Sequence, residues 1–523
     1  MNRRPVRFCS VSSCVALAAL AFAAAAPTCL GQAPGEMTPE ERAAQRDASF
    51  AKGVEMARQG ELKGGLVEID RALQMDPGFA PGYVAKGEAF RALKEYSRAV
   101  QAYTQAISLG ANVFEVFNGR GECLLEQKPP QVDLALNDFN TALEMNRSDP
   151  SVLSNVGHVM ANYTNQASEA LRYLDDALGQ RENPRDFRDR ALAHAQLREF
   201  AAAEQDIQQA IRLEADNYEN YASLAQIHLL QEQNEPAIEA LTQAIDKYAP
   251  EDRSAPPAYL DGYLLRSEAR RNLGNAAEDE ATRTVQFEAV IADCNALIDK
   301  FADNPQYAQY VGMAYYRRGM AQRMLEQFSD AIDSLTRAIQ QASSMEGGAN
   351  FLADAYLRRG ICWFYQGYTD LARGDFEAAG SSGGGFSDPR ISLWTGYTFH
   401  RDGDLRTAIE HYGKAIAKKP DFPLAYVNRG RAYFALEEYA KAIESFNDAI
   451  RVEPSNAEHY YHVGLCNMKL DRPEQARDSF KLALLKENRT PSMYRAMADV
   501  LRKLGDAPLA QEYERQAGGA AAE

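Results

Sequence analysis

Histidine pairs and cysteines are the residues of this 523-residue chain that could bind a metal ion or act as nucleophiles. His459 and His462 stand three residues apart, which places both on one face of a helix. No cysteine or carboxylate stands beside them at the spacing of a zinc site, and no HExxH sequence occurs. We therefore expect neither a metal nor another cofactor.

Two other patterns of catalytic sites are missing from the sequence. The glycine-rich run 380–385 lacks the Gly-Lys-Ser/Thr ending with which phosphate-binding loops hold a nucleotide. No serine stands in the Gly-x-Ser-x-Gly sequence of a nucleophile elbow. The sequence therefore predicts a protein that is not an enzyme.

The cysteines give no sign of a disulfide framework. Three of the seven fall within the first 29 residues, and the other four are far apart with no CxxC pair. We expect these four to be small buried apolar side chains, with a disulfide between distant positions as the alternative. They are Cys123, Cys294, Cys362 and Cys466.

The charge excludes some classes of ligand. The formal net charge is -16, which argues against nucleic acid and anionic membrane surfaces as ligands. The charge is also uneven, since residues 32–306 hold 27 basic and 45 acidic side chains, whereas residues 307–490 hold 23 of each. The first half is acidic and the second half is neutral.

An internal repeat organises almost the whole chain. Alanines that follow a large apolar residue by three places recur mostly every 33 to 36 residues. The series is Ala72, Ala106, Ala142, Ala177, Ala210, Ala244, Ala296, Ala338, Ala379, Ala415, Ala449, Ala483 and Ala517. Eleven of the thirteen positions three places earlier are large and apolar, and Asp293 and Glu514 are the exceptions. Such a period indicates a repeat architecture.

One unit shows how each repeat is built. Tyr426, Gly430 and Tyr433 share one face of a first helix, and Ala442, Phe446 and Ala449 share one face of a second. The small residues let the two helices approach closely, while the large ones fill the space between them. A single hairpin of this kind cannot bury its apolar face, so neighbouring hairpins must stack.

This pattern resembles the tetratricopeptide repeat family over about residues 46–517, with the best fit at 389–490 and the worst at 247–305. The resemblance implies an all-α solenoid of about thirteen helical hairpins, wound as a right-handed superhelix. It also implies a groove, lined by first helices, that binds proteins or extended peptides. The family implies no catalytic residues of its own.

Arginine and aromatic residues, which are frequent at binding hot spots, stand at the first-helix positions of the neutral half that are expected to face this groove. We predict that they bind an extended, partly acidic protein segment. Together with Asn428, the predicted groove residues are Arg317, Arg323, Arg358, Tyr365, Trp394, Tyr397, Arg401, Arg431, Phe434 and His462.

Other interpretations remain beside this one. In members that bind a terminal carboxylate, Lys, Asn and Arg occupy set positions, of which only Asn428 matches here and Glu458 would repel the ligand. A self-associating structural component is the main alternative, and a polysaccharide-binding envelope protein is a weaker one. The partner itself is not identified by the sequence.

The N-terminus resembles a secretory signal. Arg3, Arg4 and Arg7 precede an apolar stretch from Val15 to Ala26, which is too short to span a bilayer. We therefore expect export to the periplasm or the cell exterior, and no transmembrane helix in the mature chain. The predicted segments are a signal and linker (1–31), a lead-in (32–45), repeats 1–6 (46–249), longer irregular repeats 7–9 (250–380), a Gly/Ser linker (381–388), repeats 10–12 with a capping hairpin (389–517) and a disordered tail (518–523).

Overall fold

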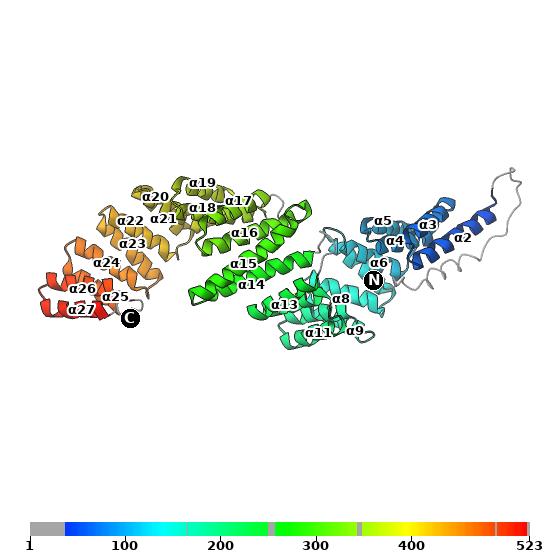
Figure 1. Ribbon diagram of the computed structural model, residues 1–523, viewed down its shortest axis with the longest axis horizontal. Coiled ribbons are helices and arrows are strands. Elements are labelled where there is room, and N and C mark those ends of the chain that lie inside the picture. Colours follow the sequence, from blue (N-terminus) through cyan, green and yellow to red (C-terminus); the bar gives the residue numbers. More distant parts are fainter. Residues whose placement is uncertain (1–36, 165, 249–256, 343–347, 487–488, 520–523) are drawn as a thin grey trace. The chain divides into compact units, whose positions relative to one another are not determined.

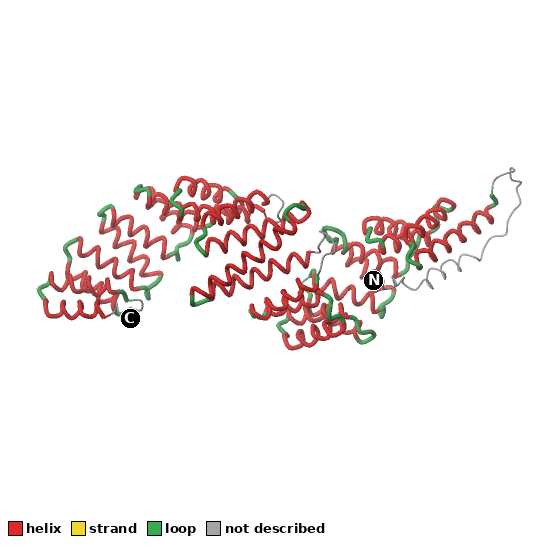
Figure 2. Tube along the Cα trace, viewed as in Figure 1, coloured by secondary structure: helices red, strands yellow, loops and turns green. Residues whose placement is uncertain are grey.

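The computed structural model describes residues 37–164, 166–248, 257–342, 348–486 and 489–519. These residues form twenty-six α-helices and two short 3-10 helices, and no strand occurs among them (Figures 1 and 2). The fold is an all-α solenoid of tetratricopeptide type. The predicted signal segment 1–31 lies outside the described residues.

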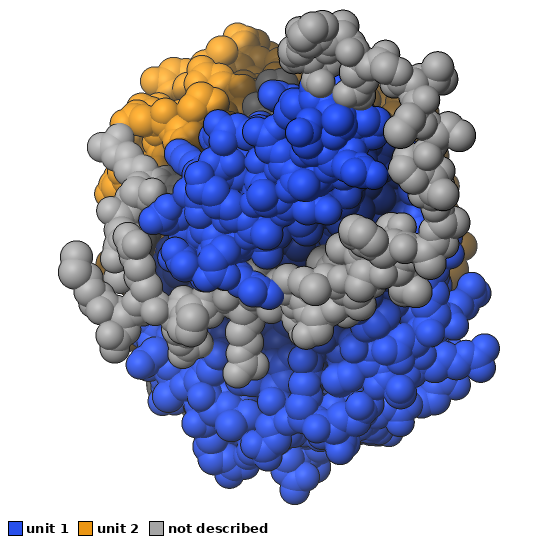
Figure 3. Space-filling view, turned by 90° about the vertical axis from the view of Figure 1, so that its right-hand side faces the viewer, with its two compact units in different colours: residues 1–248 blue, residues 249–523 orange. Residues whose placement is uncertain are grey.

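The chain consists of two compact units, with the boundary between residues 248 and 249 (Figure 3). In the first unit, six antiparallel hairpins follow one another, and each packs against the next. Their helices are α2 (Pro39–Arg58), α3 (Leu62–Met75), α4 (Ala80–Ala92), α5 (Tyr96–Ser108), α6 (Phe114–Leu125), α7 (Val132–Met145), α8 (Pro150–Asn162), α9 (Ala167–Leu178), α10 (Pro184–Gln196), α11 (Phe200–Leu213), α12 (Tyr218–Leu230) and α13 (Asn234–Lys247).

Seven further hairpins make up the second unit. Their helices are α14 (Pro257–Ala276), α15 (Glu280–Phe301), α16 (Ala308–Met324), α17 (Phe328–Gln341), α18 (Gly348–Tyr365), α19 (Thr369–Ser381), α20 (Pro389–Arg401), α21 (Leu405–Lys418), α22 (Pro423–Ala435), α23 (Tyr439–Val452), α24 (Ala457–Lys469), α25 (Pro473–Leu484), α26 (Pro491–Lys503) and α27 (Ala507–Gly519). The 3-10 helices are η1 (Pro305–Tyr307) and η3 (Gly383–Ser387).

Polar residues begin many of these helices. Asp149, Asn183 and Asp388 each accept a hydrogen bond from a backbone N–H in the first turn, and each is followed by proline. Thr38 and Glu41 form a reciprocal capping box, so α2 begins at Pro39. The first hairpin therefore starts within the segment 32–45 that the sequence presents as a lead-in.

The core consists of the large residues that define the repeat. Tyr103, Phe139, Phe376, Tyr412 and Phe446 are at most 1% exposed. Each lies against a glycine of the first helix. A β-carbon at that glycine would collide with the ring; at Gly430, for example, it would lie 2.7 Å from the Phe446 ring. Asp293 and Glu514, which occupy the position of the large apolar residue in two hairpins, differ from each other. Asp293 is buried and ion-paired, whereas Glu514 is exposed.

An arginine bridge joins successive hairpins at several places, and three of these bridges end on an aspartate of the second helix. Arg359 donates from Nε and Nη2 to Asp375 on the second helix of its own hairpin, at 2.8 and 2.6 Å. Its Nη1 donates to Thr336 on the second helix of the preceding hairpin, at 3.0 Å. Arg120 and Arg190 bind the corresponding positions in the first unit. Each bridge is partly buried and fixes one hairpin to the one before it.

The irregular region 250–380 is also built of helical hairpins, and its extra residues lie mostly in longer helices. α14 has 20 residues, α15 has 22, α16 has 17 and α18 has 18, whereas most helices of the other hairpins have 12 to 14.

The predicted Gly/Ser linker 381–388 is an ordered turn rather than a flexible connection. α19 extends to Ser381, and η3 packs against both α18 and α19. Gly385 is buried, its N–H donates to the Ser382 carbonyl at 2.9 Å, and an added β-carbon would lie 1.8 Å from the Ala379 carbonyl oxygen. The lack of a side chain at Gly385 therefore permits close packing here.

A Gly385→Ala change tests this close packing. We expect it to destabilise the α18–α19 hairpin by about 1–3 kcal/mol, because backbone atoms must move to admit the methyl group. Gly374→Ala in α19 is the control, since its β-carbon would have no neighbour within 4 Å. Unfolding followed by tryptophan fluorescence measures both, because Trp363 lies on α18. If Gly385→Ala and Gly374→Ala had equal stability, segment 381–388 would be interpreted as a flexible linker after all.

Two further expectations concern cysteine and the membrane. Cys123, Cys294, Cys362 and Cys466 are all buried and unbonded, as predicted, and burial raises the pKa of each thiol to about 12. Within the described ranges, we find no helix with the length and apolar character needed to cross a bilayer.

Candidate functional site

The predicted site residues lie on the first helices of five successive hairpins in the second unit. We call the face formed by α16, α18, α20, α22 and α24 the first-helix surface. Arg317 and Arg323 are on α16, and Arg358 and Tyr365 are on α18. The others follow in chain order: Trp394, Tyr397 and Arg401 on α20, Asn428, Arg431 and Phe434 on α22, and His462 on α24.

Four aromatic rings form a cluster that joins α18 to α20. The Trp394 ring lies 5.6 Å from Phe364, 6.0 Å from Tyr365 and 5.1 Å from Tyr397, measured between ring centroids. The Trp394 contacts are all edge-to-face, which is a favourable arrangement for aromatic pairs. Tyr365 is 53% exposed, so the cluster presents an apolar surface to solvent.

Asn428 holds this cluster in place from α22. It is buried, and its Nδ2 donates to the Tyr397 hydroxyl at 2.9 Å and to the Leu424 carbonyl at 2.6 Å. The side chain therefore positions Tyr397 instead of standing free for a ligand. Such a contact fixes the ring before any partner arrives.

Arg431 and His462 continue the surface onto α24. Arg431 Nη2 lies 3.4 Å from His462 Nε2 and 3.6 Å from a Glu458 oxygen, and its side chain is 42% exposed. The His462 ring stacks on Phe446 at 4.9 Å. Burial, together with the positive charge of Arg431, lowers the pKa of His462 to about 4, so this histidine is neutral at pH 7.

Two other predicted site residues, Arg401 and Phe434, make contacts within the fold. Arg401 Nη1 donates to the Phe364 carbonyl at 2.6 Å, and its guanidinium lies over the Phe364 ring. Phe434 packs edge-to-face on Tyr439 in its own hairpin, with 5.2 Å between the ring centroids. Arg401 therefore supports the aromatic cluster, and Phe434 belongs mainly to the hairpin core.

The remaining three arginines line one small cavity, but they differ in their partners. Arg317 pairs with Glu268 at 2.7 Å and also donates to the Leu264 carbonyl. Arg358 pairs with Asp354, and its Nε donates to the Tyr316 hydroxyl at 3.0 Å. Among the described residues, Arg323 has no acidic partner. These three arginines stand on two neighbouring first helices, α16 and α18.

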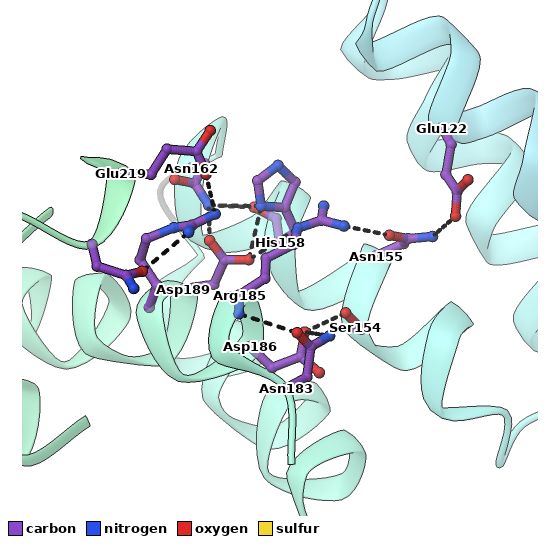
Figure 4. A network of polar contacts seen from close by, with 12 residues as sticks. Glu122, Ser154, Asn155, His158, Asn162, Asn183, Arg185, Asp186, Asp189 and Glu219 are labelled. Atoms are coloured by element: carbon purple, nitrogen blue, oxygen red, sulfur yellow. Dashed lines mark hydrogen bonds and ion pairs between the residues drawn. The ribbon is translucent and has the colours of Figure 1, made fainter. Parts of the chain in front are cut away.

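The acidic first unit contains a polar network that the sequence did not indicate (Figure 4). It connects the first helices α6, α8, α10 and α12 through paired polar side chains. Asn155 on α8 donates to Glu122 on α6 at 2.9 Å and accepts from Arg185 on α10 at 3.1 Å. Arg188 on α10 reaches Glu219 on α12 at 2.8 Å.

Two buried aspartates of this network have opposite electrostatic surroundings. Asp189 accepts from Asn162 at 2.9 Å and lies 2.8 Å from His158 Nδ1. Burial alone would raise its pKa, but His158 and two arginines lower it to about 2. Asp186 accepts from Ser154 and from Asn183, its second oxygen is buried without a partner, and burial raises its pKa.

The two histidines considered for metal binding take separate partners. His459 Nε2 lies 3.1 Å from a Glu453 oxygen, whereas His462 stacks on Phe446. No group of three or more possible ligands among His, Cys, Asp and Glu is found in the part of the chain that the structure describes.

Comparison with known families identifies the repeat. The "Tetratricopeptide repeat" profiles match residues 84–151 and 427–492, and 313–344. A "TPR repeat" profile matches residues 396–436. The chain therefore contains tetratricopeptide repeats in both units, including the irregular region.

The curated relatives are similar over part of the chain. Tetratricopeptide repeat protein 12 of Homo sapiens is 31% identical over 83 residues, which are 16% of this chain and 12% of that protein. A small glutamine-rich tetratricopeptide repeat-containing protein of Saccharomyces cerevisiae is 30% identical over 103 residues, covering 19% of this chain and 30% of that protein. Type IV pilus assembly protein PilF of Pseudomonas aeruginosa is 24% identical over 181 residues, covering 34% and 71%.

Solved structures with similar helical arrangements were also found. A tetratricopeptide repeat protein from Parabacteroides merdae covers 52% of this chain and 99% of its own, at 15% identity and a TM-score of 0.40. The Cut9–Hcn1 structure covers 88% of this chain and 97% of its own, at 16% identity and a TM-score of 0.35.

Proposed function

We propose that this protein is a non-catalytic interaction scaffold, exported to the periplasm or the cell exterior, whose first-helix surface binds an extended, partly acidic segment of another protein. The tetratricopeptide repeats support the general class, because proteins of this kind generally bind other proteins. The N-terminal sequence, with its arginines and short apolar stretch, supports export.

The continuous row of side chains from Tyr365 to His462 is the observation that carries the proposal. Aromatic rings and arginines from four successive hairpins follow one another along the first-helix surface. Their internal contacts hold them in place, so little side-chain entropy is lost when a partner binds. An extended segment that crosses several hairpins would meet an exposed ring at Tyr365 and a partly exposed positive charge at Arg431.

Charge reversal at Arg431 tests this surface. The mature chain is used as bait in the envelope fraction of its source organism, and the affinity of the captured protein is then measured by calorimetry. We expect Arg431→Glu to weaken binding at least tenfold, or about 1.4 kcal/mol, because the reversed charge repels an acidic segment. Arg358 is less suitable for this test, because its side chain is 23% exposed and closely paired with Asp354 and Tyr316, whereas Arg431 is 42% exposed.

Arg451→Glu provides a matched control in the same hairpin. Arg451 carries the same charge and is 72% exposed, but it stands on the second helix α23. Binding by this variant should equal that of the wild type. Equal loss in both variants, or capture of nothing but the bait's own chain, would contradict the proposal, and the second result would favour self-assembly.

A further inference from the structure

A small cavity in the second unit is lined mainly by cationic and apolar side chains. It lies among α14, α15, α16 and α18 and has a volume of about 160 Å³. This is the volume of about five water molecules, which is enough for one small polar group. Its charged lining consists of Arg271, Arg317, Arg323 and Arg358, and Asn275 adds an amide. Methionine side chains and Phe287 form an apolar part of the wall.

The acidic groups beside the cavity neutralise only part of its charge. Glu268 pairs with Arg271 at 3.2 Å and with Arg317 at 2.7 Å. Asp354 pairs with Arg358. Two carboxylates thus pair with three of the four guanidinium groups, and Arg323 is left without an acidic partner among the described residues.

Among the described residues, Arg323 is the cavity arginine that has no acidic partner. Its Nε is buried and has no hydrogen-bond acceptor among the described residues, and its Nη2 reaches only the Met324 sulfur at 3.4 Å. A buried donor without an acceptor costs free energy, and a sulfur is a weak acceptor. Burial lowers the pKa of Arg323, and the charge of Arg358 lowers it further. The folded chain therefore holds a guanidinium in a position that an anion would stabilise.

We propose that this cavity binds one oxyanion, a carboxylate or a phosphate group carried by the bound protein segment, with Arg323 as its principal ligand. The inference rests on the proposed function, since it places one acidic group of the partner at a defined point of the first-helix surface. Guanidinium groups bind planar or tetrahedral oxyanions through paired N–H donors. The apolar wall accommodates the methylene groups that carry such an anion on a side chain.

Small probes test the cavity without knowledge of the partner. The mature protein is titrated with inorganic phosphate and, separately, with N-acetylglutamate amide, at constant ionic strength, and binding is followed by phosphorus line broadening and saturation-transfer NMR. We expect at least one probe to bind, Arg323→Gln to weaken it at least tenfold, and Arg323→Lys to restore part of the affinity. N-acetylglutamine amide, which is neutral, should not bind.

Arg451→Gln is the control for non-specific attraction to a positive side chain, because Arg451 lies outside the cavity. Binding of the glutamate probe alone identifies an acidic side chain as the source of the anion, and binding of phosphate alone identifies a phosphorylated one. Absence of binding by both probes, or equal affinities in wild type and Arg323→Gln, would overturn the inference.

Partner capture separates this inference from the proposed function. If the wild type captures no partner while the probes bind in an Arg323-dependent way, the scaffold proposal fails and the oxyanion site stands. If a partner binds wild type and Arg323→Gln equally and the probes show no difference, the scaffold stands and the oxyanion site is wrong.

Discussion

A Gly430→Trp change is expected to destabilise the α22–α23 hairpin by at least about 3 kcal/mol and to loosen the hairpins on either side of it. A β-carbon at residue 430 would lie 2.7 to 2.9 Å from three atoms of the Phe446 ring. That ring is 1% exposed and is packed among Ala442 and Ala449, so it has no space into which it can move. A tryptophan side chain overpacks this dense core, so the expected loss of folding free energy exceeds that caused by one added methyl group.

The effect should decrease with distance along the array. In stacked repeats each hairpin contacts mainly its neighbours, so damage spreads through nearest-neighbour interfaces. Hydrogen exchange with mass spectrometry measures this, because it reports protection hairpin by hairpin. We expect faster exchange in α20 to α25 and unchanged exchange in the first unit. Uniform loss of protection along the whole chain would contradict the prediction.

Gly413→Trp is the matched control. Gly413 lies on α21, and a β-carbon there would have no neighbour within 4 Å. Its replacement should therefore change protection little. A second control combines Gly430→Ala with Phe446→Leu, because a smaller side chain at 446 leaves room for the added methyl group. The double variant should lose less stability than the sum of the two single changes, as expected for residues in contact.

The repeat could be predicted because it depends on residue size at fixed spacing. The pairing of Gly430 with Phe446 appears in the sequence as a small and a large residue sixteen places apart, and the structure brings the two into contact. The position of the core was therefore predictable in eleven of the thirteen hairpins.

The polar contacts could not be predicted in the same way, because charged residues at helical spacing look alike whether they face solvent or a neighbour. Arg358 and Arg359 are adjacent, yet the first pairs with Asp354 at the first-helix surface and the second bridges two hairpins through Asp375. The arginine bridges do carry a signal that was missed. Each arginine precedes the small residue of its first helix, and each aspartate precedes the large residue of its second.

The face on which the candidate site lies could be predicted, but not which of its side chains are unpaired and able to bind a ligand. First-helix positions identified the side chains that lie together, and Arg317, Arg323 and Arg358 do line one cavity. Which of them is free for a ligand depends on partners such as Glu268, which comes from the preceding hairpin, about fifty residues away in the chain. No local pattern reports such a contact.

The polar network of the first unit leads to an expected contrast between two neighbouring aspartates. Asp189→Asn should destabilise this unit by about 3 kcal/mol, because the buried carboxylate that contacts His158, Asn162 and Arg185 is lost and the Arg185 charge loses a counter-ion. Asp186→Asn, three residues earlier on the same helix, should leave stability unchanged or raise it by up to about 1 kcal/mol. Asp186 has one buried oxygen without a partner, so its charge is held at a cost.

The pH dependence should separate the same two residues. The folded pKa of Asp189 is about 2, below its ordinary value of 3.8, so its contribution to stability is complete above about pH 5 and is lost as the pH falls toward 2. A shift of this size corresponds to about 2 kcal/mol. The pKa of Asp186 is raised, so its ionisation opposes folding as the pH rises through the folded value. Asp189→Asn should therefore flatten the acid side of the stability profile, and Asp186→Asn should remove a loss of stability that accompanies rising pH.

Two spectroscopic probes can assign these effects to the first unit. Both tryptophans, Trp363 and Trp394, lie in the second unit, so their fluorescence follows only that unit, whereas far-ultraviolet circular dichroism follows both. In urea titrations, Asp189→Asn should lower the midpoint of a circular-dichroism transition while the fluorescence transition stays unchanged. A parallel shift of both signals would show that the two units unfold together, and equal effects of the two substitutions would refute the electrostatic contrast. The expected result follows from side-chain partners alone, since both aspartates are almost fully buried on α10 and differ chiefly in the groups that surround them.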